Sequence, residues 1–189
     1  IPKIVLNNSE IKLTDIGSNQ TLLFKAKNLF ASYRNNIIKI HSNFIHQASP
    51  NPITLVYRGE LKDDKIESKI FVSGNSIKIP YSLLPNQMQN FKSNQMSLRV
   101  WLNLHDTNVI RASGNISTDR LSMNIGKSIY TAENINSDIL FVKEKESETL
   151  SLMRMNYVIN GTNIRNNKIV VSKDNKRNMK IFIKENGNK

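Results

Sequence analysis

The chain has 189 residues, a length that suits one domain with a hydrophobic core of its own. It contains no cysteine, which excludes disulfides, a thiol nucleophile, iron–sulfur clusters and cysteine-ligated zinc. The 27 lysines and arginines outnumber the 15 acidic residues and give a net charge of +12, which favours an acidic partner such as nucleic acid, an anionic membrane surface or an acidic glycan. No run of about 18 apolar residues is present, so we expect no transmembrane segment.

Apolar residues recur with a period of two along most of the chain, which is the pattern of half-buried β-strands. Residues 96–105 show it most clearly. From Met96 to Leu104 every second residue is apolar, and these residues share one face of the predicted strand. The opposite face carries Ser97, Arg99, Trp101, Asn103 and His105.

About a dozen such runs follow one another, separated by Asn, Gly, Asp and Ser residues that favour turns. Asn160-Gly161 is the strongest hairpin candidate among them. The regular spacing predicts an all-β, antiparallel single domain over residues 1–189, either a sandwich or a closed sheet. The predicted strands are 4–6, 10–13, 21–27, 37–44, 53–58, 69–73, 76–79, 96–105, 109–113, 138–142, 149–159, 168–172 and 179–183.

Two segments leave room for an exception to the all-β pattern. Residues 22–33 place Leu22, Ala26, Leu29, Phe30 and Tyr33 on one helical face, although their first part also alternates. We expect a strand that runs into a turn or a short helix. The polar residues 85–95 predict a long loop or another short helix.

No pattern of catalytic or metal-binding residues is present. His41 and His46 lie five residues apart on a predicted strand and therefore point to opposite faces, which does not suit a shared metal ion. Neither a nucleophile elbow, a zinc-protease motif nor a phosphate-binding glycine loop occurs. We therefore expect a protein that is not an enzyme, with no catalytic residues, no metal and no cofactor.

Trp101, the one tryptophan, lies on the polar face of its predicted strand. An aromatic side chain beside Arg99 and Asn103 suits stacking on a sugar ring, a base or a partner side chain. The alternative is a sheet that is covered on both sides, in which Trp101 belongs to a second core.

Residues 71–120 carry a resemblance to a known family. Phe71-Val-Ser-Gly-Asn-Ser-Ile-Lys-Ile-Pro80 is followed by Leu84-Pro85, by the alternating strand around Trp101, and by Ser113-Gly-Asn-Ile-Ser-Thr-Asp119. This order resembles subunits of chaperone–usher fimbriae, particularly tip adhesins of alpha-type pili. The resemblance covers about a quarter of the chain.

The resemblance implies an immunoglobulin-like sandwich that lacks one strand and is completed by a neighbouring subunit through donor-strand complementation. Both chain ends offer an alternating peptide for this role, and the alternative is that both are ordinary strands of the protein's own sheet. Other pilus subunits or a periplasmic chaperone are the implied partners. The candidate strand-complementation residues are Ile4, Leu6, Ile11, Leu13, Met179, Ile181 and Ile183.

These observations lead to the expectation of a secreted binding protein, exported through the periplasm to the cell surface as a fimbrial (pilus) subunit or adhesin. Its candidate ligand-binding residues are Trp101, Arg99 and His105, and an acidic glycan or host receptor is the expected ligand. The alternative is a basic all-β nucleic-acid-binding protein, because residues 154–189 hold nine basic and two acidic side chains. A third possibility is an assembly subunit with no ligand of its own.

Overall fold

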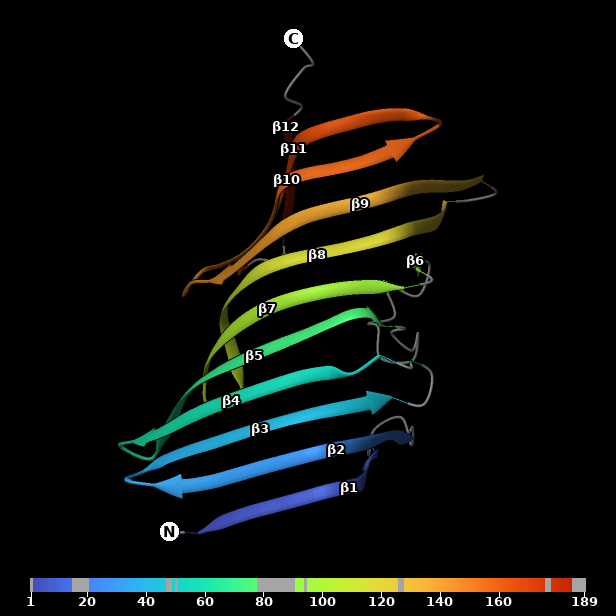
Figure 1. Cartoon of the computed structure of the whole chain (residues 1–189). Coiled ribbons are helices and arrows are strands. Elements are labelled where there is room, and N and C mark those ends of the chain that lie inside the picture. Colours follow the sequence, from blue (N-terminus) through green and yellow to red (C-terminus); the bar gives the residue numbers. More distant parts are fainter. Residues whose placement is uncertain are drawn as a thin grey trace.

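The computed structural model describes residues 2–14, 21–46, 49, 51–77, 91–93, 95–125, 128–175 and 178–184. Within these residues the chain forms no helix, and all of its strands belong to one antiparallel sheet (Figure 1). The strands are β1 (Lys3–Thr14), β2 (Thr21–Arg34), β3 (Ile37–His46), β4 (Ile53–Lys62), β5 (Lys65–Ile77), β6 (Phe91–Ser93), β7 (Met96–His105), β8 (Asn108–Ile125), β9 (Ser128–Lys143), β10 (Ser147–Ile159), β11 (Thr162–Asp174) and β12 (Met179–Lys184).

The sheet is a meander in which, apart from the short β6, each strand pairs with the next one in the chain. Its order is β1-β2-β3-β4-β5-β7-β8-β9-β10-β11-β12, and the short β6 pairs with β8 outside this path. The predicted all-β, antiparallel class is therefore confirmed. The immunoglobulin-like sandwich is not confirmed, because the described strands form one sheet and no second sheet covers it. Alternation identifies the apolar face of a strand but not what lies against that face.

Three segments singled out in the sequence can be located in the sheet. The run at 96–105 is strand β7, and residues 22–33 belong to one continuous strand, β2, without a helix. Most of the polar segment 85–95 lies outside the described residues, as do Ile79-Pro80 and Leu84-Pro85 of the fimbrial resemblance.

Tight hairpins connect several neighbouring strands. Asn160 and Gly161 have φ angles of 50° and 76° and join β10 to β11, which confirms the predicted hairpin. Asn35-Asn36 and Asp63-Asp64 make similar two-residue turns with positive φ at both positions. Such turns match the twist of the flanking strands, and Asn, Asp and Gly tolerate the left-handed conformation that they need.

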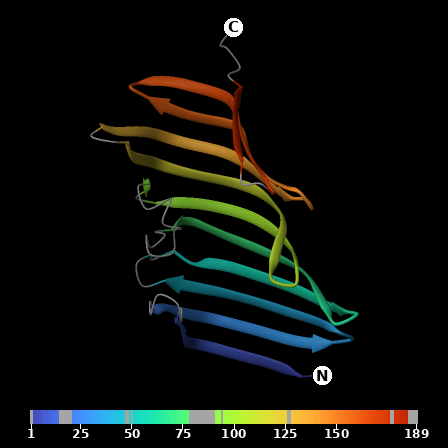
Figure 2. The same ribbon diagram turned by 180° about the vertical axis from the view of Figure 1, so that it is seen from behind.

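The sheet is arched rather than flat, as the views from both sides show (Figure 2). Irregularities in the strand register accompany the bending. Residues with positive φ occur inside strands at Asn8, Ser76, Asn134, Arg154 and Asn166, at or beside shifts in strand pairing. A β-bulge adds one residue to one strand and so bends the strand and increases its twist.

Very little of this sheet is covered by the rest of the chain. Among the described residues, Ala26 and Ile77 are the hydrophobic ones that are buried. The accessible surface is 13672 Å². A compact monomer of 21.6 kDa should expose only about 9,200 Å². The described residues therefore lack the second layer that normally buries the apolar face of a sheet.

Candidate functional site

The register divides the side chains of the sheet between two faces, because cross-strand partners project to the same side. One side, here called the apolar face, carries two rows that cross all strands of the meander path without a charged residue. The first row is Ile4, Ala31, Ile40, Tyr57, Ile70, Leu102, Ala112, Phe141, Leu150, Val171 and Ile181. The second is Leu6, Leu29, Ser42, Leu55, Val72, Val100, Gly114, Ile139, Leu152, Ile169 and Ile183.

The opposite side, the polar face, has a different composition in each row. Its central row, here called the aromatic row, is Val5, Phe30, His41, Val56, Phe71, Trp101, Ser113, Leu140, Ser151, Val170 and Phe182. The adjacent row, here called the basic row, is Lys3, Ser32, Lys39, Arg58, Lys69, Asn103, Arg111, Val142, Thr149, Ser172 and Lys180.

Trp101 lies in the aromatic row at the centre of the sheet. Its residue surface is 50% exposed, so no second core covers it in the described structure. Its ring lies 4.7 Å from the ring of Phe71, measured between centroids, with 44° between the planes. The tilted contact leaves part of the indole surface free for a partner.

Arg99 and His105 lie on the same face of β7 as Trp101 but in different hollows. Arg99 lines a polar hollow of about 690 Å³ together with Thr54, Ser73 and Asn115. His105 lines another, of about 430 Å³, beside Arg58. The structure thus places the three predicted ligand-binding residues along one strand without gathering them in one pocket.

The basic row contains six cationic side chains, all exposed, and no carboxylate. Lys39, Arg58 and Lys69 are direct cross-strand neighbours on β3, β4 and β5. None of the six forms an ion pair within the described structure, although Lys3 lies 4.9 Å from the centre of the Phe30 ring. Like charges placed opposite one another destabilise a sheet, so this row is a cost to folding.

The candidate strand-complementation residues lie on the two edge strands. Ile4, Leu6, Ile11 and Leu13 belong to β1, and Met179, Ile181 and Ile183 belong to β12. Each strand pairs with its neighbour in the chain, as ordinary strands do, and no other described strand pairs with its outer side. Ile4 is 56% exposed and Ile181 is 60% exposed. Both edges therefore retain unpaired backbone groups that another strand can bind.

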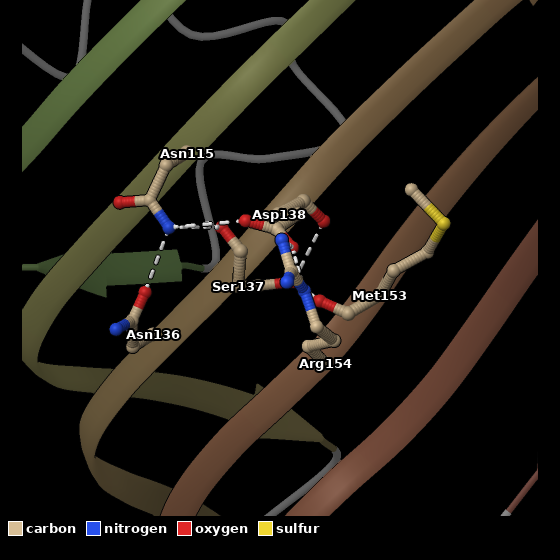
Figure 3. Close-up of polar contacts among 6 residues, drawn as sticks. All are labelled: Asn115, Asn136, Ser137, Asp138, Met153 and Arg154. Carbon is tan, nitrogen blue, oxygen red and sulfur yellow. Dashed lines mark hydrogen bonds and ion pairs between the residues drawn. The ribbon is translucent and has the colours of Figure 1, made fainter.

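A polar network fastens the sheet where β8, β9 and β10 bend (Figure 3). The amide nitrogen of Asn115 donates hydrogen bonds to Asn136 Oδ1 at 2.9 Å and to the Ser137 carbonyl at 3.2 Å. Arg154, which has a φ of 50°, forms an ion pair with Asp138 on the adjacent strand. These contacts hold the bulged region in register, and we assign them a structural role.

In the described part of the chain, no three His, Asp or Glu side chains come together as ligands of a metal ion would. No helix long and apolar enough to cross a membrane occurs in the residues that the structure describes.

Comparisons with known proteins give no family for this chain. No protein-family model, no curated protein and no solved structure matches it. Its function must therefore be argued from the two faces and the two edges of the sheet.

The rows are the feature that reasoning along the sequence missed. Lys39, Arg58 and Lys69 are scattered in the sequence and align only once the strand register is known. The two-residue hairpin at Asp63-Asp64 fixes the register of β4 and β5, so counting outward from this turn would have aligned Arg58 with Lys69. Lys39 joins them through the pairing of β3 with β4, and the longer connection between these two strands gives no such signal.

Proposed function

We propose that this chain is a non-catalytic binding protein whose apolar face holds the acyl chains of an anionic amphiphile. The observation that carries the proposal is a continuous apolar surface that nothing in the described structure covers. No large apolar side chain in its two rows is buried. Uncovered apolar surfaces of this size mark binding sites.

The shape of the apolar face suits a long, thin ligand. The two rows run across eleven strands. At a strand spacing of about 4.8 Å they extend for about 48 Å. Two side chains in these rows carry a hydroxyl, Tyr57 and Ser42. Ser42 is buried, and its hydroxyl donates a hydrogen bond to the Asn28 carbonyl at 2.9 Å. Acyl chains need apolar contact along their length and no polar partner, and these rows supply such contact.

Charge favours an anionic amphiphile over a second copy of the chain. Two apolar faces packed together would bring two molecules of charge +12 into one particle, and their mutual repulsion opposes that association. An anionic headgroup instead complements the net charge. A sandwich would arise only if a second sheet occupied the face, and that arrangement is the competing outcome of the test below.

The test uses adjacent residues of β7 that face opposite ways. Leu102→Asp places a charge in the apolar row, whereas Asn103→Asp places the same charge on the polar face. We expect delipidated protein to bind a fluorescent fatty acid, and Leu102→Asp to weaken binding at least tenfold. Asn103→Asp should leave binding within about twofold, since it meets no acyl chain.

Two controls distinguish binding of an acyl chain from coverage of the apolar face by a second copy of the chain. If Leu102→Asp proves unstable, Val72→Thr replaces it as the test variant. This change keeps the shape of the side chain in the apolar row but adds a hydroxyl, and it should weaken binding of the fatty acid. Light scattering on the ligand-free protein reports whether two copies associate. A dimer that Leu102→Asp dissociates, together with no fatty-acid binding, would overturn the proposal in favour of a two-sheet sandwich.

The open edges favour a second candidate function, an assembly subunit that joins its neighbours by strand pairing. Exposed apolar residues on β1 and β12 support it. A fimbrial subunit or adhesin would use these edges for polymerisation and the Trp101 surface for its receptor. Light scattering on the full chain and on a chain lacking Ile1 to Leu13 tests it, because an assembling edge makes the full chain polymerise and the shortened one not.

A further inference from the structure

We propose that the polar face docks the protein on an anionic lipid bilayer, with the basic row against the headgroups and the aromatic row at the membrane interface. This surface lies on the opposite side of the sheet from the apolar face. The inference therefore stands independently of acyl-chain binding, and each can fail without the other.

Charge complementarity is the first argument. The six cations of the basic row gain no ion pair from the described structure. Glu60 and Glu67 lie two residues from Arg58 and Lys69 on this face, but they are 3.7 and 3.4 Å from Lys62. Lys62 therefore neutralises these two carboxylates in part. Clustered Lys and Arg side chains on one face bind anionic lipid surfaces.

The aromatic row is the second argument. Phe30, Val56 and Trp101 are exposed beside the basic row, although each is a large apolar side chain. Tryptophan rings favour the headgroup level of a membrane, and lysine stems lie along apolar surface while their amines reach the headgroups. An apolar row flanked by cations therefore has the arrangement of an interfacial membrane surface.

The composition of that row favours a bilayer over single-stranded nucleic acid. Nucleic-acid binders stack successive bases on aromatic rings, and each stacking position needs a ring. Val5, Val56 and Leu140 occupy other positions of this row, so its rings do not form a continuous series. Aliphatic side chains cannot stack with bases in this way, but they insert readily among lipid chains.

Trp101 supplies a direct reporter, since it is the only tryptophan in the chain and belongs to this face. The experiment mixes the full chain with phosphatidylglycerol vesicles or phosphatidylcholine vesicles and measures co-sedimentation and tryptophan emission. We expect binding to phosphatidylglycerol alone, a blue shift of Trp101 emission, and quenching by brominated lipid. Binding should weaken at least tenfold between 0.05 and about 0.5 M salt, because ions screen the attraction.

Matched triple variants test the row itself. Lys39→Gln/Arg58→Gln/Lys69→Gln removes three charges from the basic row and should weaken vesicle binding about 100-fold. Arg120→Gln/Lys145→Gln/Lys173→Gln removes three exposed charges away from the basic row and should weaken it far less. Circular dichroism confirms that both variants fold.

Several results would overturn the inference. Equal weakening by the two triple variants would make the attraction a general charge effect. Vesicle binding without any change in Trp101 emission would mean that another surface docks. If the protein binds oligo-dT but not phosphatidylglycerol vesicles, and the basic-row variant loses that binding, the face is a nucleic-acid surface. If the protein binds phosphatidylcholine vesicles as tightly as phosphatidylglycerol vesicles, charge has no role in docking.

Discussion

Trp101 and Phe71 are direct cross-strand neighbours on β7 and β5, with ring centroids 4.7 Å apart. The pair lies at the centre of the polar face, and no second layer among the described residues covers it. The contact therefore combines two roles, because it fastens two strands and leaves half of Trp101 exposed to a partner.

We expect the pair to add a measurable but modest stability. A cross-strand aromatic contact contributes about 0.5–1.5 kcal/mol beyond the area that it buries. A double-mutant cycle with Trp101→Ala and Phe71→Ala, measured by urea unfolding, should give a coupling energy in this range. Trp101→Ala alone should shift Tm by only a few degrees, whereas a large loss of stability would mean that Trp101 is part of a core.

Gly114→Ala should destabilise the protein strongly. A β-carbon at this position would collide with the carbonyl oxygen of Arg99 and lie 2.8 Å from the Val100 Cα atom, both of them backbone atoms of the adjacent strand. Because backbone cannot move aside cheaply, we expect a loss of about 2–4 kcal/mol in urea unfolding.

Gly161→Ala provides the matched control for this prediction. Nothing lies within 4 Å of the added carbon there, and the strain comes from a φ of 76° alone. The loss should be about 1 kcal/mol. Equal effects at the two glycines would contradict the close approach of β7 and β8.

At Arg154 we expect the opposite behaviour from Gly114, because replacing its large side chain with glycine should not lower the stability of the protein. Its φ of 50° strains a residue that bears a β-carbon, and its ion pair with Asp138 is solvent-exposed on the arginine side, where 78% of the side chain is accessible. Removing the strain should offset the loss of a surface ion pair.

We therefore expect Arg154→Gly to leave the free energy of unfolding within about 0.5 kcal/mol of wild type. Arg154→Ala keeps the strain and loses the ion pair, so it should be less stable than Arg154→Gly. The reverse order, measured by urea unfolding at low and high salt, would show that the ion pair dominates.

Self-association should depend on the edges and not on the middle of the sheet. Val5 and Phe182 occupy the aromatic row on the edge strands β1 and β12, and Val56 occupies it on β4. Charged residues on an edge oppose strand pairing. Val5→Lys/Phe182→Lys should abolish any concentration-dependent association seen by light scattering, and Val56→Lys should not. Association that survives the edge variant would exclude strand pairing as its cause.

The local sequence pattern predicted the strands and the two faces of each strand. It did not predict how many sheets stack on one another. The alternation at 96–105 predicted both the bounds of β7 and the side on which Trp101 lies. The same alternation would arise in a sandwich, where a second sheet covers Leu98, Val100 and Leu102. The prediction of an immunoglobulin-like sandwich therefore went beyond what the pattern determines.

The asparagine residues likewise indicate where the chain is irregular but not which kind of irregularity forms there. Asn8, Asn134 and Asn166 have positive φ within strands, where bulges bend the sheet. Asparagine tolerates this conformation in a turn as well as in a bulge, so its presence indicates a local irregularity. The pairing of the strands on either side decides whether the chain reverses or only bends.

By itself, the sequence determined that this protein is an antiparallel β-protein, with hairpins at turn-forming pairs and one apolar side to each strand, because these properties depend on residues close together in the chain. The tertiary structure decided that the strands form a single arched meander, that no other described part of the chain covers its apolar face, and that Lys39, Arg58 and Lys69 form a row beside Trp101. Those properties depend on strand register and on which layers meet, and both are set by contacts between residues far apart in the sequence.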